Sequence, residues 1–311
     1  MKIATEELGM IEKSIKKRRV KSFFEGMLYL LPSILLFGTF LFYPLLRTIY
    51  LSFFLTTHGG APARFVGLTN YANLFINPET APLFLNSLQV TFQFVLFTVP
   101  ATIILALTFA VMCNEKLKGI GIFRMIFSST MGISVAAGSM IWMFLFHPVI
   151  GRVNQVLAIF GVDRIYWLTS TEWALISVSI STVWMNLGFT FLILLGGLQT
   201  IPVYLYESAD IDGCSYFYKL RRVTLPMLSP TLFFVVTISL INSFQTFGQI
   251  DMLTSGGPNN ATNLIVYSIY QDAFINFRHG PASAQAFVLF LIILLLTAIQ
   301  FKVAERRVHY Q

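Results

Sequence analysis

The stretch YESADIDGCSYFYKLRRVTLP, residues 206–226, is a charged segment that lies between two strongly apolar segments. Pro202 can begin a helix just before it, because proline is well tolerated in a first helical turn. Gly213 allows the backbone to bend, and Pro226 favours the end of a second helix where the next apolar run begins. The sequence therefore predicts a polar helix-turn-helix at a membrane surface.

Composition places the rest of the chain in a lipid bilayer. Hydrophobic residues make up 56% of the 311 positions and charged residues 11%, and the mean hydropathy is +0.72. A soluble domain has about 25% charged residues. We expect an all-α polytopic membrane protein, because helices satisfy their own backbone in lipid. Six windows are long and apolar enough to cross about 30 Å of hydrocarbon: residues 27–53, 87–113, 123–146, 173–197, 227–250 and 283–302.

The distribution of Lys and Arg predicts the orientation of these six spans. With both termini in the cytoplasm, sixteen of the 21 Lys and Arg residues fall on the cytoplasmic side and five on the other. This bias follows the positive-inside rule, and it accounts for the net charge of +7 better than nucleic acid binding does. We expect a basic cytoplasmic tail at 1–26, a transmembrane domain at 27–302 with a cytoplasmic loop at 198–226, and a cytoplasmic C-terminus at 303–311.

Two local features should shape the spans. Pro44 lies within the first apolar window, which predicts a kink or break near Tyr43 and Pro44. The third window holds small residues at four-residue spacings, Gly132 with Ala136 and Ser134 with Gly138. Small residues at this spacing let two helices approach closely, so we expect a packing seam there.

Metal and disulfide chemistry is not expected. Cys113 and Cys214 both fall on the predicted cytoplasmic side, where thiols stay reduced. The four histidines are scattered without ligand spacing, so we predict no metal site. The basic segment KSIKKRRVK, residues 13–21, could attract anionic membrane lipid.

Uncharged polar side chains form rows along three spans, of which one, Asn86, Gln89 and Gln93, lies near the external end of the second span. Ser179, Thr182, Asn186 and Thr190 share one face of the fourth span, and Ser239, Asn242, Gln245 and Gln249 form a row in the fifth. Amides that face lipid are costly, so these rows should face other helices or a water-filled path. Hydrogen bonds between helices are one explanation. The other is that Asn186, Asn242, Gln245 and Gln249 contact a hydroxyl-rich solute.

The middle of the six spans contains no Asp, Glu, Lys, Arg or His. Ion-coupled carriers usually place ionisable groups there, which disfavours a stand-alone secondary carrier or channel for small hydroxylated solutes. An intramembrane enzyme is also disfavoured, because neither Gly-x-Ser-x-Gly nor His-Glu-x-x-His occurs.

The spacing within residues 207–226 resembles the EAA signature of ABC-importer permease subunits. That signature runs Glu-Ala-Ala, three residues, Gly, nine residues, Ile, one residue, Leu-Pro. The chain matches it with Glu207, Ala209, Gly213, Leu225 and Pro226. Ser208 and Val223 depart from it by small changes of similar shape, and Asp210 follows the Glu-Ser-Ala triplet.

The resemblance implies that residues 198–226 form a coupling loop that docks on an ATP-hydrolysing subunit. Glu207 would make the polar contact with that subunit, Ala209 would pack closely, and Gly213 would permit the bend. The chain has no Gly-x-x-x-x-Gly-Lys-Ser/Thr phosphate loop. It should therefore be a non-catalytic subunit without a cofactor of its own, with ATP and Mg²⁺ bound by the partner ATPase.

The whole chain is similar to the carbohydrate-uptake branch of these permeases, which includes maltose-type and sn-glycerol-3-phosphate-type subunits. The segments FVGLTNYANLF at 65–75, TSGGP at 254–258 and QFKVAERRVHYQ at 300–311 carry this likeness. It implies a type I ABC-importer transmembrane domain in the bacterial cytoplasmic membrane. The implied partners are a second homologous permease, two ATP-binding subunits and an extracytoplasmic solute-binding protein. The implied solute is a sugar or a glycerol-3-phosphate-like compound.

Overall fold

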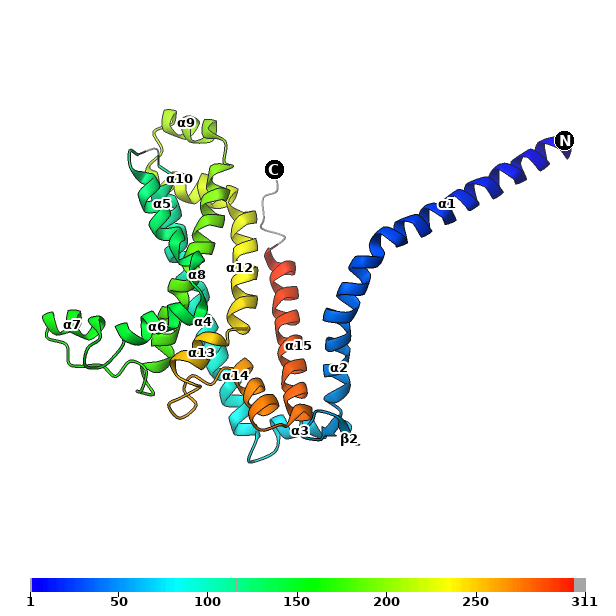
Figure 1. Cartoon of the computed structure of the whole chain (residues 1–311). Helices are drawn as coiled ribbons and strands as arrows, with labels where there is room; N and C mark the ends of the chain where they lie inside the picture. Colours follow the sequence, from blue (N-terminus) through cyan, green and yellow to red (C-terminus); the bar gives the residue numbers. More distant parts are fainter. Residues whose placement is uncertain (1, 116, 305–311) are drawn as a thin grey trace.

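Helices form most of the chain, as an apolar sequence in lipid requires. A computed structural model describes residues 2–115 and 117–304 (Figure 1). Most of the predicted C-terminal segment, 303–311, lies outside the described residues.

Four helical segments are long, apolar and unbroken by sharp bends. They match the predicted first, second, fourth and sixth spans. Their bounds are Lys21–Leu51, which combines parts of α1 (Lys2–Phe37), η1 (Gly38–Phe42) and α2 (Tyr43–Leu51), then Ala81–Cys113 (α4), Ala174–Gln199 (α8) and His279–Lys302 within α15 (His279–Ala304).

The predicted third span is a bent pair and not one helix. Ile120–Gly132, which comprises α5 (Ile120–Ser128) and η2 (Ser129–Gly132), meets α6 (Val135–Leu145) at 106°. The expected Gly132–Ala136 seam is therefore wrong, because the helix ends between the two residues. Gly138 does pack closely, since a Cβ there would lie 2.7 Å from Cε of Met185 on α8.

The predicted fifth span, 227–250, is also interrupted. Helix Tyr216–Met227 bends by 69° into α12 (Ser229–Phe244). The chain then leaves the helix at Gln245 and resumes in α13 (Gly248–Leu253). Pro226 lies in the last turn of the first helix of this pair, which ends one residue later at Met227, close to the expected end.

A widened helical turn precedes two of the prolines. Pro44 follows the π-turn η1, where the Tyr43 N–H donates to the Gly38 carbonyl. Pro226 follows the π-turn η3 (Leu220–Thr224) at the same offset. A proline has no N–H and its ring clashes with the carbonyl four residues earlier, so the turn expands. The kink predicted near Pro44 takes this form.

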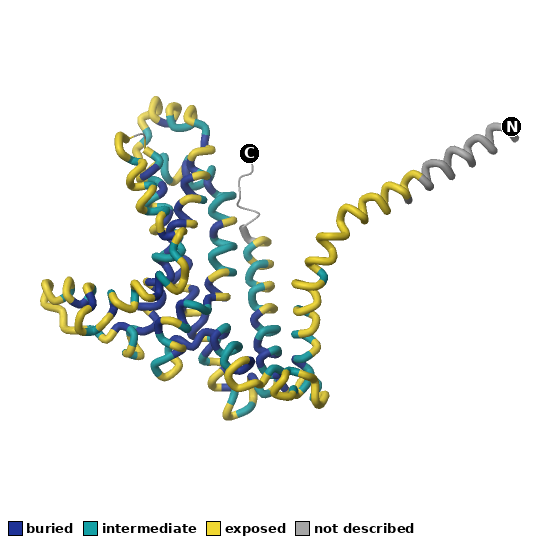
Figure 2. Tube along the Cα trace, in the orientation of Figure 1, coloured by how far each residue is buried: buried dark blue, intermediate teal, exposed yellow. Residues whose placement is uncertain are grey.

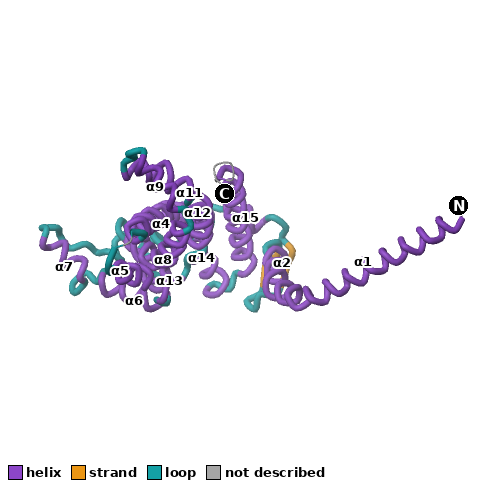
Figure 3. Tube along the Cα trace, turned by 90° about the horizontal axis from the view of Figure 1, so that it is seen from above, coloured by secondary structure: helices purple, strands orange, loops and turns teal. Residues whose placement is uncertain are grey.

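The first helix stands apart from the bundle. None of the apolar window within Lys21–Leu51 is buried against the rest of the chain (Figure 2). Seen from above, α1 extends away from the other helices, while α2 lies closer to α15 (Figure 3). The expected tail at 2–26 is helical and continues directly into the first span.

Shorter elements gather at the end of the molecule opposite α9 (Val203–Ile211) (Figure 1). A small hairpin of β1 (Phe54–Thr56) and β2 (Pro62–Phe65) departs from the all-helical expectation. The first turn of α15 packs tightly against it, because a Cβ on Gly280 would lie on the Phe54 carbonyl oxygen. The remaining short helices there and elsewhere are α3 (Thr69–Phe75), α7 (Arg152–Ile159), α14 (Ile265–Tyr270) and η4 (Gln271–Ile275).

The main core joins α4, α8 and α12. Its fully buried members include Ala106, Phe191, Leu194 and Leu228. Helix α8 lies close to α12 at Gly197, where an added Cβ would lie 2.6 Å from Oγ1 of Thr231. Lipid is as apolar as these side chains, so close packing holds the helices together rather than hydrophobic burial.

Adjacent glycines test this contact. Gly197→Ala should destabilise the fold by about 1–3 kcal/mol, because the α8–α12 interface has no room for a methyl group. Gly196→Ala is the matched control, since nothing lies within 4 Å of its added Cβ and the helix gains up to about 1 kcal/mol from alanine. Thermal unfolding in nanodiscs should give a lower midpoint for Gly197→Ala than for Gly196→Ala. Equal midpoints would contradict the close contact.

Candidate functional site: the 198–226 loop and a transmembrane cavity

The predicted helix-turn-helix is present in the 198–226 loop. Helix α9 begins directly after Pro202, and α10 (Tyr216–Lys219) begins after Ser215, whose Oγ accepts a hydrogen bond from the Tyr218 N–H. Between them Gly213 adopts a φ of +69°, which L-residues rarely adopt. The backbone reversal at Gly213 therefore depends on glycine.

The motif residues divide into an exposed face and a buried one. Glu207, Ser208 and Asp210 are exposed on α9. Ala209 is buried against its own chain, and its carbonyl accepts a hydrogen bond from the Cys214 N–H. The exposed carboxylate of Glu207 is free to meet another molecule, whereas Ala209 helps to hold the loop together.

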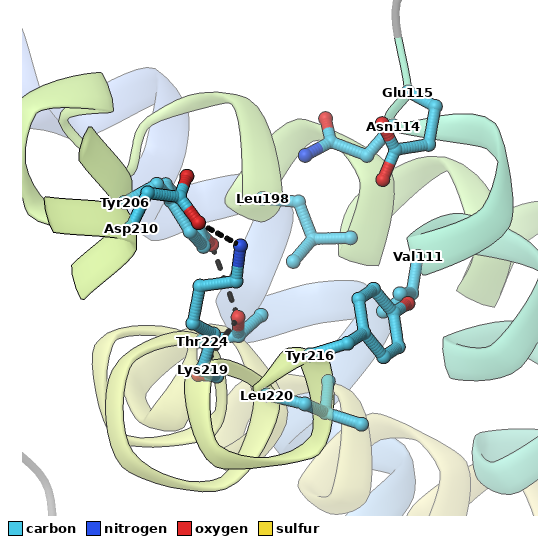
Figure 4. Close-up of a pocket in the computed structure, with 10 residues that line it drawn as sticks. All are labelled: Val111, Asn114, Glu115, Leu198, Tyr206, Asp210, Tyr216, Lys219, Leu220 and Thr224. Carbon is cyan, nitrogen blue, oxygen red and sulfur yellow. Dashed lines mark hydrogen bonds and ion pairs between the residues drawn. The ribbon is translucent and has the colours of Figure 1, made fainter. Parts of the chain in front are cut away.

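Polar contacts fix α9 over the helices that follow it (Figure 4). Nζ of Lys219 lies 2.6 Å from Oδ1 of Asp210. The Tyr206 hydroxyl lies 3.1 Å from Oγ1 of Thr224. These contacts flank a cavity of about 360 Å³ between the loop and the ends of α4 and α8. The loop therefore lies against the ends of two spans, α4 and α8.

Apolar contacts continue from the loop into the core. Leu205 and Tyr206 of α9 and Met227 pack against the main core, which contains Leu198 at the end of α8 and Leu228 at the start of α12. The last motif residues, Leu225 and Pro226, are half-buried in α11 (Leu225–Met227), directly before the bend into α12. A displacement of α9 would therefore reach both α8 and α12.

A second cavity, of about 210 Å³, lies within the membrane-spanning part. We call it the transmembrane cavity. Its walls come from η2, Ile133, Val135, α8, α12 and Gln249. Asn186 lies near the middle of α8, about 18–20 Å from either end at 1.5 Å per residue. All of the described residues that line this cavity are uncharged.

The structure brings together three of the four amides expected to contact solute. Asn186, Asn242 and Gln249 all line the transmembrane cavity. Gln245 does not, because it is the exposed C-terminal cap of α12. The expected row along one helix is wrong beyond Asn242, since the helix ends before Gln245. Gln249 reaches the cavity from α13, with Nε2 3.6 Å from Sδ of Met185.

Hydrogen bonds between helices account for little of the polar row on α8. The hydroxyls of Ser179 and Thr182 donate to carbonyls of their own helix, at Leu175 and Val178. Within the described part of the chain, no hydrogen bond joins the side-chain amide of Asn186 to another group.

Several lining residues were not singled out from sequence. Thr130, Met131 and Ile133 line the cavity because the third span breaks beside them. The polar run Ser-Ser-Thr at 128–130, inside an apolar window, was the available signal. Met185 and Ser239 also line it, and Ser239 belonged to the predicted row.

Comparison with known proteins identifies related transport proteins. Residues 84–310 match the family described as binding-protein-dependent transport system inner membrane component. The chain is 34% identical over 282 residues to the sn-glycerol-3-phosphate transport system permease protein UgpA of Agrobacterium fabrum, covering 90% of this chain and 94% of that protein. It is 31% identical to the sulfoquinovosyl glycerol transport system permease protein SmoG of the same organism, covering 91% of each.

A solved structure shares the fold. The chain superposes on a chain of a bacterial ABC transporter involved in the import of the acidic polysaccharide alginate with a TM-score of 0.77 at 26% sequence identity. The match covers 93% of this chain and 98% of the other.

Proposed function

Since the chain belongs to the family of binding-protein-dependent transport system inner membrane components, and is a multi-pass permease subunit of an ABC importer, we propose that it forms half of a translocation path for a sugar or polyol. The transmembrane cavity carries this proposal. Its amides from α8, α12 and α13 offer neutral donors and acceptors at mid-membrane. Such contacts suit hydroxyl groups and let the solute leave again.

The solute class is supported by what the related proteins carry. One is named for sn-glycerol-3-phosphate and another for sulfoquinovosyl glycerol. The solved structure is that of a transporter involved in the import of an acidic polysaccharide. All three solutes are hydroxylated and acidic. We therefore include sugar phosphates and glycerol-3-phosphate-like compounds among the solutes of this chain.

An acidic group on the solute needs a partner that this cavity lacks. A phosphate is best met by Arg or Lys, and none of the described cavity residues is charged. In the proposed assembly, the second permease or the binding protein supplies that contact, while this chain holds the hydroxylated part. The absence of ionisable lining also disfavours an ion-coupled carrier as the alternative.

The 198–226 loop is the proposed coupling element. Glu207 projects from α9 to meet the ATPase, and Asp210, Ala209 and Gly213 keep α9 in position. ATP and Mg²⁺ bind the partner ATPase and not this chain, which acts without catalysis of its own. The full assembly would contain this chain, a second homologous permease, two ATP-binding subunits and an extracytoplasmic binding protein.

The mechanism that follows is alternating access. Closure of the ATPase pair moves α9, and the packed contacts at Leu198 and Leu228 carry that movement into α8 and α12. Both helices also contribute amides to the transmembrane cavity, so their displacement opens it towards the binding protein. Release of the ATPase pair after hydrolysis returns the cavity to its inward-facing state.

Removal of the Glu207 carboxylate should uncouple transport. Glu207→Ala should lower ATP-dependent uptake roughly tenfold or more, as expected for the loss of a charged hydrogen bond, with normal membrane insertion. Asp212→Ala is the matched control, because Asp212 is an exposed acid just past α9, at a position that the signature leaves open. Uptake assays in whole cells and quantification of the chain in membranes check both. Equal uptake by the two variants would contradict the coupling role.

The turn at Gly213 should accept only residues that tolerate a left-handed backbone. Gly213→Val should abolish uptake, since a β-branched residue there is strained by roughly 1–2 kcal/mol or more. Gly213→Asn should retain most uptake, because Asn visits this conformation. Nothing in the described chain lies within 4 Å of a Cβ at Gly213, so the Cβ of Val would not clash within this chain. Full activity of Gly213→Val would show that the turn is not needed.

The transmembrane cavity predicts a difference between two neighbouring amides. Asn242→Leu should lower uptake at subsaturating solute roughly fivefold, the effect of losing about one hydrogen bond. Gln245→Leu should have little effect, because Gln245 lies outside the cavity. The measurement is initial uptake rate against solute concentration for both variants. A larger defect in Gln245→Leu would mean that the solute takes another path.

A further inference from the structure

Another polar cavity lies at the end of the molecule opposite the 198–226 loop. Its volume is about 210 Å³, and it is bounded by α3, the first turn of α4, the loop before α14, α14 itself, η4 and the first two turns of α15. These elements lie together at the end of the molecule away from α9 and α10 (Figure 1). We call this cavity the outer pocket.

Amide side chains dominate the lining of the outer pocket. They come from four separate parts of the chain and include Asn73, Asn260, Asn263, Gln271 and Gln285. An amide has both donors and an acceptor, a combination that matches hydroxyl groups, which also donate and accept. Of these amides, that of Gln285 is already bonded to Asp272 and Ser268.

The two charged residues among the described lining of the outer pocket, Asp272 and Arg278, form an ion pair with each other. The buried carboxylate of Asp272 accepts hydrogen bonds from Nε and Nη2 of Arg278, with Nε at 3.1 Å. The same oxygen, Oδ1, also accepts a hydrogen bond from Nδ2 of Asn276 at 3.2 Å. The other oxygen, Oδ2, accepts a hydrogen bond from Nε2 of Gln285 at 2.6 Å. Because this carboxylate is already paired, the pocket favours a neutral group over an ion.

One amide in the lining is buried and incompletely bonded. Asn263 is 5% exposed, and its Oδ1 accepts no hydrogen bond from any of the described residues. A buried acceptor in this condition is costly, so a donor from a bound hydroxyl would relieve the cost.

The wall that carries Asn263 is held in place. Nδ2 of Asn86 on α4 donates to the Asn260 carbonyl at 3.1 Å, and the Ile265 N–H donates to Oγ1 of Thr91 at 2.9 Å. The Asn263 N–H donates to the same Asn260 carbonyl at 3.2 Å. The pocket is therefore preformed, as small-molecule sites usually are.

We propose that the outer pocket binds a small polyhydroxylated group, such as one sugar ring or a glycerol unit, separately from the transmembrane cavity. Its volume is below the roughly 300 Å³ at which most ligand pockets begin, which limits the ligand to a single unit. The inference rests on the proposed function for the solute class and for placing the pocket on the extracytoplasmic side. The site would hold solute at the entrance before it passes between the helices.

Binding of glycerol to the assembled transporter tests this site. The complex is placed in nanodiscs without the binding protein or ATP, and saturation-transfer NMR reports glycerol bound to it. Asn263→Leu should weaken binding roughly tenfold, as the loss of a buried hydrogen bond predicts. Gln245→Leu, at an exposed amide outside both cavities, is the control and should retain it. If Asn263→Leu does not fold, Gln271→Met removes another lining amide with little change of shape.

Each outcome decides for or against the outer pocket. Loss in Asn263→Leu with retention in Gln245→Leu supports it. Unchanged binding in Asn263→Leu, loss only when Asn242 of the transmembrane cavity is replaced by Leu, or no signal from the unmodified complex overturns it. The proposal is also overturned if Asn263→Leu keeps glycerol binding and loses only affinity for the binding protein. The outer pocket would then be a docking site for that protein. ATP-dependent uptake by the unmodified complex tests the proposed function separately.

Discussion

In the hydrocarbon interior a backbone N–H or C=O without a partner costs several kcal/mol, so a spanning helix can break only where protein or water meets the freed groups. The third and fifth spans both break, at Ile133–Ser134 and at Gln245–Phe247. The halves that follow, α6 and α13, pack together closely, since a Cβ on Gly248 would lie 2.8 Å from Cγ1 of Val135. The breaks thus occur beside one another and leave the transmembrane cavity against α8.

The same two helices connect the cavity to the 198–226 loop. At one end α8 and α12 meet at Gly197 with no space for a methyl group, and α9 packs over that contact. About half a helix length away, Asn186 and Asn242 line the cavity. Because a packed helix moves as a unit, a push on α9 would reach the amides without a separate relay.

Local sequence signals predicted the membrane class, six spans and the helix-turn-helix, because hydropathy, Gly213 and the motif spacing are each properties of a short segment. Four of those spans are unbroken helices and two are bent pairs. The breaks were missed because hydropathy windows register apolarity and not continuity. For the same reason Gln245 was placed in a row that the end of α12 excludes. The outer pocket could not be predicted, since its amides come together only in the folded chain, from Asn73 to Gln285.

Isolation of this chain with its partners tests the central claim most directly. The chain would be tagged, purified gently from its native membrane, and every co-purifying subunit identified by mass spectrometry. An importer permease should bring with it a second permease, an ATP-binding subunit and a solute-binding protein. Recovery of the chain alone, still able to move solute into vesicles without ATP, would contradict the account and favour a secondary carrier.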